Sequence, residues 1–248
     1  MNENQTYRFA IVCALMDEAQ PLLFFFKKFK PKIKIFSTSE KNKLFVLTFS
    51  KPLVFLNFQI LKLHIYVSGV GKTNAAIAAT KLIFNYKINY IINVGLIGIL
   101  DKKISLFLPI LVNKIIYHDV DLTNFCYQLG QLPGLPSCYE IKSNEVNQLM
   151  KIFKKNKIKA FKCNIATGDQ FIDKNKLKNI LNIKHTIVQG IDMELASLMQ
   201  VCYLNKIQIL SIKFGSDYVK SKNNYLMFQQ AKDEYKKILL NMLNFLFN

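Results

Sequence analysis

The chain has 248 residues, an apolar content of 51% and a formal net charge of +18. This size suits one large α/β domain, residues 1–248, and the apolar content excludes a disordered chain. No apolar run approaches the roughly 18 residues of a membrane span. The five cysteines form no close pair, which is typical of reduced thiols. Because a signal-peptide pattern is also absent, we expect a cytoplasmic protein.

The charge alone would suit a protein that binds nucleic acid or a membrane surface. However, the lysines are spread over almost the whole chain, and Arg8 is the sole arginine. Arginine supplies the two-pronged contacts that favour phosphates and guanine edges. The densest basic stretch, residues 27–43, is interpreted as a solvated hairpin or loop. We expect no nucleic-acid and no membrane partner, with a basic nucleic-acid- or nucleoside-binding protein without catalysis as an alternative.

Short apolar runs alternate with helical patterns along the chain, which predicts βα units and a mostly parallel sheet. In chain order the expected elements are a strand at 9–15, a helix from 16, a strand at 64–68, a helix at 72–86, strands at 90–100, 108–118, 161–167 and 185–191, a helix at 192–204, a strand at 208–214 and a helix at 224–247. Residues 119–139 are rich in turn formers and predict a long loop, a kind of segment that tends to be functional.

The stretch "YVSGVGKTNAA", residues 66–76, contains the Gly-Lys-Thr of a phosphate-binding loop. The full signature requires a glycine five positions before Gly71, and Tyr66 stands there. We therefore interpret the stretch as a strand that passes through a tight glycine turn into a helix.

Carboxylates follow three of the predicted strands. Glu18 (with Asp17), Glu194 (with Asp192) and Asp217 each come directly after an apolar run. In an open parallel sheet the ligand crevice lies beyond the carboxyl ends of the strands. The simpler interpretation, that acids favour the first turn of a helix, applies least to Asp217, which a polar loop follows. Three carboxylates in one crevice predict acid/base chemistry on a polar neutral substrate, such as glycosyl transfer or hydrolysis.

A metal site is a weaker interpretation. His118, Asp119 and Asp121 lie close together in "YHDVD" and could be ligands. Because no second cluster accompanies them, we expect no metal and no cofactor.

Seven motifs now resemble a known family. The stretches "CALMDEAQPLL", "VSGVGKTNAA", "INVGLIGIL", "YHDVDLTNFCYQLGQLPGLP", "ATGDQFI", "GIDMELASLMQVC" and "IKFGSDYV" occur in the order found in 5′-methylthioadenosine/S-adenosylhomocysteine nucleosidases. The resemblance covers almost the whole chain. It implies a three-layer α/β/α fold around a central twisted mixed β-sheet, as in nucleoside phosphorylases, and hydrolysis of the N-glycosidic bond of thio-nucleosides, including 5′-deoxyadenosine as a further candidate substrate.

The resemblance also implies a role for each acid. Asp217 would be the general acid that protonates purine N7, with Ser216 orienting its carboxylate. Glu18 would position and activate the attacking water. Glu194 would bind the ribose hydroxyls, with Met193 packing against the sugar.

The remaining contacts to the substrate follow from the same resemblance. Phe171 would stack on adenine, the backbone of Ile172 would read its hydrogen-bonding edge, and Val70 would face the ligand. The resemblance further implies a homodimer, in which the loop at residues 120–136 completes the partner's site. The loop residues that would cover the 5′-alkylthio group are Leu122, Phe125 and Pro133.

The sequence departs from the family pattern at four positions. Leu96 stands where the family usually carries a serine, so a hydroxyl near Glu18 is missing. Lys213 replaces the usual arginine before "SD", and Asp192 shortens a usual glutamate. "SDYV" replaces the common Ser-Asp-x-Ala. Since Glu18, Glu194 and Asp217 are all present, we still expect an active enzyme.

A purine nucleoside phosphorylase is the nearest alternative. It would need basic side chains around a phosphate, yet Arg8 precedes the first strand, at the wrong end for the crevice. Glu18 at the water position would also repel phosphate. Both observations favour hydrolysis.

Overall fold

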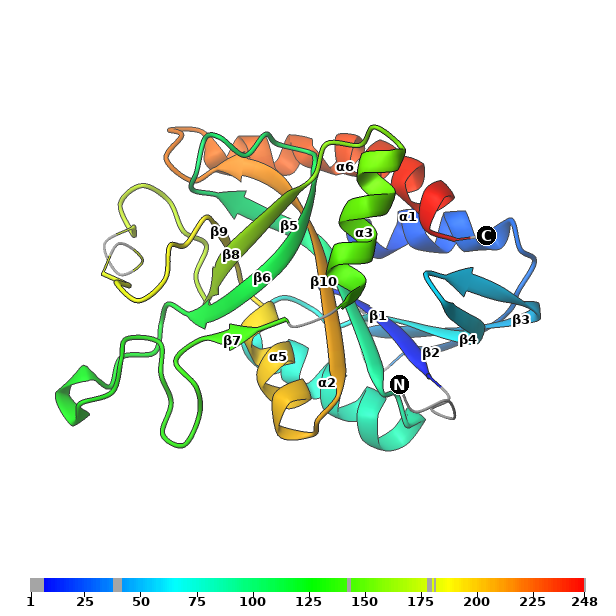
Figure 1. Cartoon of the computed structure of the whole chain (residues 1–248), viewed down its shortest axis with the longest axis horizontal. Coiled ribbons are helices and arrows are strands. Elements are labelled where there is room, and N and C mark those ends of the chain that lie inside the picture. Colours follow the sequence, from blue (N-terminus) through cyan, green and yellow to red (C-terminus); the bar gives the residue numbers. More distant parts are fainter. Residues whose placement is uncertain (1–6, 38–41, 142–143, 178–179, 181, 248) are drawn as a thin grey trace.

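The computed structural model describes residues 7–37, 42–141, 144–177, 180 and 182–247 (Figure 1). Its elements are, in chain order, β1 (Phe9–Cys13), α1 (Met16–Lys27), β2 (Lys32–Ser37), β3 (Lys43–Phe55), β4 (Phe58–Val67), α2 (Lys72–Tyr86), β5 (Tyr90–Ile99), β6 (Pro109–Tyr117), the 3₁₀ turn η1 (Thr123–Phe125), β7 (Tyr139–Glu140), α3 (Asn144–Lys155), β8 (Phe161–Thr167), β9 (Gly190–Asp192), α5 (Leu195–Leu204), β10 (Gln208–Tyr218) and α6 (Asn224–Leu246).

The strands form one mixed sheet in the order β10-β6-β8-β9-β5-β1-β4-β3-β2, with β7 paired to β6. The strand β5 runs parallel to both β1 and β10, so the carboxyl ends of these three strands meet at one edge. The additional pairing of β10 with β5 closes β10, β6, β8, β9 and β5 into a ring. The mixed sheet that the family resemblance implies is thereby confirmed. The mostly parallel sheet expected from the alternation of apolar runs and helical patterns is not found, because antiparallel pairs join β2–β3–β4, β5–β9 and β6–β10.

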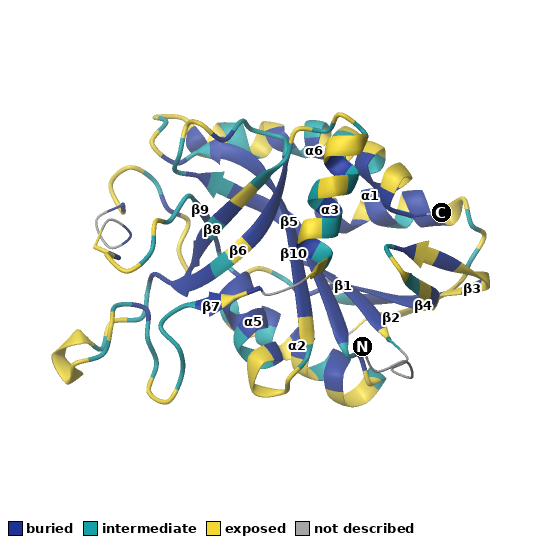
Figure 2. Cartoon of the chain, viewed as in Figure 1, coloured by how far each residue is buried: buried dark blue, intermediate teal, exposed yellow. Residues whose placement is uncertain are grey.

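Helices cover the sheet on two sides, which confirms the α/β fold class. In Figure 1, α2 and α5 lie together below the sheet, and α1 and α6 lie together above it. Almost every residue of β5 is buried, as expected for a strand with helices on both faces (Figure 2). Among the described helices, none has the length and apolar character that crossing a membrane requires.

Several predicted boundaries were wrong. The strand expected at 185–191 shortens to β9, because only Gly190–Asp192 pair with β5 and β8. The helix expected from position 192 begins at Leu195, since Asp192 still belongs to β9. The basic stretch 27–43 was predicted as a solvated hairpin or loop, and β2, an exposed strand within it, pairs antiparallel with β3. The length of β3 beyond this stretch, the short strand β7 and the helix α3 were not predicted.

Local chemistry explains the turn before α2, whose predicted bounds are confirmed. Gly71, the residue before the helix, has a φ of 100°, a conformation that favours glycine. The helix ends at Lys87, which adopts the left-handed conformation and donates its N–H to the Leu82 carbonyl. The strand that leads into this turn is β4, and the antiparallel strands β2 and β3 lie between β1 and β4 in the chain.

Candidate active site

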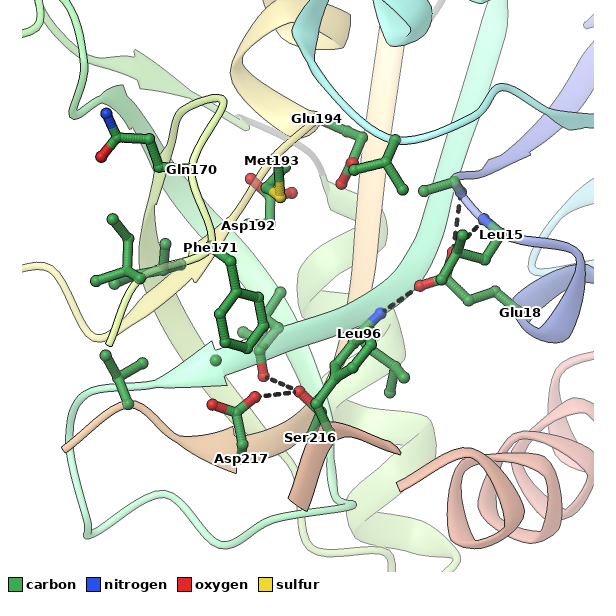
Figure 3. A pocket seen from close by; sticks show the side chains of 18 residues that line it. Leu15, Glu18, Leu96, Gln170, Phe171, Asp192, Met193, Glu194, Ser216 and Asp217 are labelled. Atoms are coloured by element: carbon green, nitrogen blue, oxygen red, sulfur yellow. Dashed lines mark hydrogen bonds between the residues drawn. The ribbon is translucent and has the colours of Figure 1, made fainter. Parts of the chain in front are cut away.

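One cavity lies beyond the carboxyl ends of β1, β5 and β10 and gathers side chains from distant parts of the chain (Figure 3). Nine of the residues predicted from the sequence line it: Glu18, Val70, Phe171, Ile172, Asp192, Met193, Glu194, Ser216 and Asp217. Lys213 lies behind this wall and is paired with Asp192. The loop residues Leu122, Phe125 and Pro133 do not line the cavity.

The carboxylate of Glu18 is held by three backbone N–H groups. Oε2 accepts hydrogen bonds from Ala14 N at 2.9 Å and Leu15 N at 3.0 Å, and Oε1 accepts one from Leu96 N at 2.9 Å. A side chain at Gly95 would lie 2.8 Å from Oε1, so this approach requires a glycine. Although Leu96 lacks the hydroxyl of the family pattern, its backbone still anchors the carboxylate. Burial raises the pKa of Glu18, against the opposing effects of Lys213 and the three N–H groups.

Asp217 sits where the pairing of β10 with β5 shifts register, between Gly215 and Asp217. Such bulges re-aim side chains at functional sites. The Ser216 Oγ lies 2.6 Å from Asp217 Oδ1 and 3.1 Å from the Ile97 carbonyl oxygen. The hydroxyl has one hydrogen for these two neighbours, so it can donate to Ile97 and accept from a protonated Asp217. Burial raises the pKa of Asp217, although hydrogen bonds from Ser216 and Asn224 oppose the shift.

Asp192 and Lys213 form a buried ion pair beside the cavity. The Nζ of Lys213 lies 2.9 Å from Asp192 Oδ2, and the lysine side chain is only 2% exposed. Asp192 also accepts hydrogen bonds from Thr167 Oγ1 at 2.6 Å and from Leu195 N, at the start of α5, at 3.1 Å. Burial would lower the pKa of Lys213, but Asp192 and Glu194 outweigh it and the pKa is raised. The charged pair thus ties β10 to β9, two residues before Glu194 in the chain.

Glu194 immediately precedes α5 and reaches across to α2. Its Oε1 accepts a hydrogen bond from Gly71 N at 2.9 Å. Burial, with the charge of Asp192 adding to it, raises the pKa of Glu194 to about 8. The simpler interpretation, that acids favour the start of a helix, also holds for these two residues. Asp192 accepts a hydrogen bond from the first N–H group of α5, and Glu194 directly precedes that helix.

The base of α2 explains the apparent phosphate loop. Its two leading N–H groups are already taken by carboxylates of the chain: Gly71 N donates to Glu194, and Lys72 N donates to Asp169 Oδ1 at 2.8 Å. The Lys72 Nζ lies 2.7 Å from Asp119 Oδ2, which also accepts a hydrogen bond from Asp169 N at 2.9 Å. The anion site of this helix is therefore occupied internally.

Phe171 and Ile172 form the wall next to Asp217. Phe171 is 40% exposed, and its ring makes edge contacts with Tyr225 and Phe228 of α6. The carbonyl of Ile172 accepts a hydrogen bond from Asn224 Nδ2 at 3.0 Å. The wall thus presents the ring of Phe171 to the cavity (Figure 3), and the buried Ile172 lines the cavity beside it.

Sequence reasoning missed several contributors. Asp169 and Lys72 hold the segment before Phe171 against α2, and Asn224 supports both Ile172 and Asp217. Asp169 carries the signal that marked the other acids, a carboxylate soon after an apolar run. Leu15 lies in the first of the seven motifs without having been given a role, and Phe228 lies in none of them; both line the cavity.

The proposed metal ligands are engaged elsewhere. Asp119 pairs with Lys72, and Asp121 accepts hydrogen bonds from the backbone and hydroxyl of Thr123. Within the described ranges, no group of three or more histidine, cysteine or acidic side chains could hold a metal ion.

Comparison with known proteins identifies the class. The family model for the phosphorylase superfamily matches residues 8–244, so the chain belongs to that superfamily. A 5′-methylthioadenosine/S-adenosylhomocysteine nucleosidase of Buchnera aphidicola subsp. Baizongia pistaciae is 31% identical over 246 residues, 98% of this chain and 92% of the relative. That of Bacillus subtilis is 32% identical over 168 residues, 67% of this chain and 72% of the relative. Within the superfamily, the chain belongs to the 5′-methylthioadenosine/S-adenosylhomocysteine nucleosidase family.

Solved structures share the fold. The Streptococcus pyogenes S-adenosylhomocysteine nucleosidase, in complex with 5-methylthiotubericidin, has a TM-score of 0.80 at 23% identity, covering 98% of each chain. The Neisseria meningitidis nucleosidase, in complex with methylthio-immucillin-A, has a TM-score of 0.79 at 21% identity, covering 95% of this chain and 97% of that one. The futalosine hydrolase of Helicobacter pylori also has a TM-score of 0.79, at 20% identity, covering 96% and 98%. The predicted nucleoside phosphorylase-like fold is thereby confirmed.

Proposed function

We propose that this protein hydrolyses the N-glycosidic bond of 5′-methylthioadenosine and S-adenosylhomocysteine and releases adenine. One observation carries the proposal: Asp217, whose raised pKa favours its protonated form, shares a cavity with Glu18, whose carboxylate is held by three N–H groups. An acid and a base in one enclosed site are the two groups that glycosidic hydrolysis requires.

The reaction follows from these positions. Protonated Asp217 gives its proton to N7 of the purine, and the electrons of the glycosidic bond move into the base. Water then bonds to the anomeric carbon of the cationic sugar and gives a proton to Glu18. Because burial disfavours the anions of Glu18 and Glu194, the positive charge that develops on the sugar stabilises these carboxylates, and they in turn stabilise the transition state.

The other residues bind the nucleoside or position the side chains that bind it. Glu194 accepts hydrogen bonds from the ribose hydroxyls, and Met193 packs against the sugar. Phe171, Ile172 and Val70 surround the rest of the nucleoside. Asp192 and Lys213 act through Glu194 and are positioning residues.

Phosphorolysis is less well supported. Among the described residues that line the cavity there is no lysine or arginine to bind phosphate. Arg8 precedes β1, at the end of the strand opposite the cavity, and the N-terminal N–H groups of α2 already bind carboxylates. Water is therefore the favoured nucleophile.

We also propose a cytoplasmic homodimer in which the cover loop, residues 120–136, completes the site of the other subunit. The loop projects from the body of the chain, and its residues are exposed or half-buried, except Gly130 (Figure 2). Phe125 is 72% exposed, so its ring is available to pack against a second subunit. The rest of the site belongs to one domain that spans the chain.

The test is to incubate purified protein with each nucleoside, with and without phosphate, and to measure free adenine by chromatography. We expect adenine without phosphate and a loss of about a thousandfold in kcat in Asp217→Asn. Strict dependence on phosphate, or an unimpaired variant, would contradict the proposal. Affinity for single- and double-stranded oligonucleotides at about 150 mM salt, expected to be weak, tests the nucleic-acid alternative.

A further inference from the structure

Three charged side chains lie beside the proposed active site without lining its cavity. The Nζ of Lys72, the first residue of α2, lies 2.7 Å from Asp119 Oδ2 and 4.0 Å from Asp169 Oδ2. The Lys72 N–H donates to Asp169 Oδ1 at 2.8 Å, and the Asp169 N–H donates to Asp119 Oδ2 at 2.9 Å. Each member of this charged triad, Lys72, Asp119 and Asp169, therefore contacts both of the others.

Two members of the charged triad adjoin other segments of the proposed site. Lys72 directly follows Gly71, whose N–H donates to Glu194, the proposed ligand of the ribose. Asp119 directly precedes the cover loop. The ion pair of Lys72 with Asp119 therefore fixes the start of α2 against the root of that loop.

The third member, Asp169, leads into the base wall, Phe171 and Ile172, which lines the cavity. The charged triad binds this segment at Asp169. Three residues further on, the carbonyl of Ile172 accepts a hydrogen bond from Asn224 Nδ2 at 3.0 Å. Phe171 lies between these two anchors and is 40% exposed, so the position of its ring depends on where they hold the backbone.

Close packing of backbone makes these contacts possible. A Cβ at Gly168 would lie 2.4 Å from His118 Cε1 and 2.8 Å from Asp119 Cγ. A Cβ at Gly71 would lie 3.0 Å from Asp169 Oδ1. Glycine at both positions therefore lets the segment before the base wall approach α2 and the root of the cover loop closely enough for the charged triad to form.

Lys72 balances two negative charges that face each other. The side chain of Asp119 is only 15% exposed, and within the described ranges its Oδ1 has no hydrogen-bond partner. Without the ammonium group, the carboxylates of Asp119 and Asp169 would repel each other across a partly buried contact. Asp169 is 48% exposed, so the segment that carries it is free to move toward solvent.

We propose that the charged triad positions the base wall: by holding Asp169 against Asp119, Lys72 keeps the ring of Phe171 where it stacks on adenine. This inference rests on the proposed function and extends it to residues that touch no substrate. Because the charged triad does not line the cavity, we expect it to govern affinity for the base and to leave the chemical step nearly unchanged.

The experiment uses adenine, which has neither sugar nor 5′ substituent, together with methylthioadenosine. In Lys72→Met, we expect the Kd for adenine, measured by titration calorimetry, and the KM for methylthioadenosine to rise about fivefold, and kcat to change by less than about twofold. Lys72→Arg, which keeps the charge, should retain most of the affinity. Asp119→Asn removes the ion pair from its other side and should also raise both constants. Lys81→Met, in the same helix and outside the charged triad, is the matched control.

A double-mutant cycle determines whether Lys72 acts through Phe171. Once Phe171→Ala has removed the ring, we expect Lys72→Met to weaken adenine binding no further, because the effects of coupled residues do not add. Additive effects, equal losses in Lys72→Arg and Lys72→Met, or a loss confined to kcat would each overturn the proposal. If neither Lys72→Met nor Asp119→Asn folds, the charged triad supports the fold rather than the base wall, and the proposal is also overturned.

Failure of the proposed function gives a different result. The unmodified protein would then bind adenine and release none from methylthioadenosine. The adenine affinities of the variants would still decide whether the charged triad positions the base wall.

Discussion

Two regions of the proposed site are built in opposite ways. The acid cluster, formed by Glu18, Asp192, Glu194 and Asp217, is buried, and hydrogen bonds from the same chain hold every carboxylate. The cover loop leaves Phe125 exposed and away from the cavity. The difference indicates that one chain suffices to position the four carboxylates, whereas the proposed apolar cover over the 5′ group would have to come from a second chain.

The largest effect is expected within the acid cluster. Glu18→Gln removes the base that accepts a proton from water, and we expect kcat to fall about a thousandfold. Stability should change little, because two effects oppose each other: the variant removes a carboxylate whose ionised form burial disfavours, but its amide nitrogen cannot accept the hydrogen bond that Leu96 N donates to Glu18. Adenine release and urea denaturation measure the two properties. Glu234→Gln, in α6, is the control, and a Glu18→Gln enzyme with a tenth or more of the original kcat would contradict the assignment.

The ion pair behind the cluster should govern stability. Lys213→Met leaves Asp192 charged and buried without its partner, and we expect the free energy of unfolding to fall by about 3 kcal/mol. Lys213→Arg, which keeps the charge, should lose less, and the exposed Lys220→Met should be neutral. Urea denaturation at pH 7 measures all three. An equal loss in the arginine and methionine variants would mean that packing, rather than charge, is what Lys213 provides.

The cover loop should affect substrate binding and leave folding intact. In Phe125→Ser we expect a KM for methylthioadenosine about tenfold higher, from the lost burial of an aromatic ring. The same change at Phe24, an exposed residue of α1, should leave KM unchanged.

Mixing chains tests whether the loop acts across a dimer. Phe125→Ser chains combined with Asp217→Asn chains form one site with an intact acid and an intact loop from its partner. A fraction of the sites should then regain the original KM. If mixing restores nothing, the loop serves its own chain or has no role in the site.

The smallest effect concerns pH. The pKa of Glu194 is raised from 4.5 to about 8 in the folded protein, so the folded state binds more protons than the unfolded state between these values. The contribution of Glu194 to stability is therefore present at low pH and is lost as the pH rises through this window. Denaturation at pH 5.5 and 7.5 should show a smaller decline in Glu194→Gln than in the unmodified protein. If stability falls equally in the two proteins, another group is responsible for the pH dependence.

The sequence predicted best those helices and strands whose ends and apolar faces are marked by nearby residues. The helix α2 has apolar spacing on one face and glycines before it, and its bounds were predicted correctly. The strand β9 was predicted too long, because "HTIVQGI" is apolar enough for a strand, yet only its end finds partners in β5 and β8. The strand β3 was missed although much of it is buried and only two residues separate it from β4. Pro52 and the register shift between Thr48 and Leu53 interrupt its strand pattern.

The sequence by itself determined the chemistry available to this protein: carboxylates placed after apolar runs, a single arginine, and seven motifs in the order of one family. The tertiary structure decided how that chemistry is used. It brought Gly71 to Glu194 and Leu96 to Glu18, contacts between residues 123 and 78 positions apart. Parallel strands bring such residues together because their carboxyl ends meet at one edge, and no local pattern encodes which strands become neighbours.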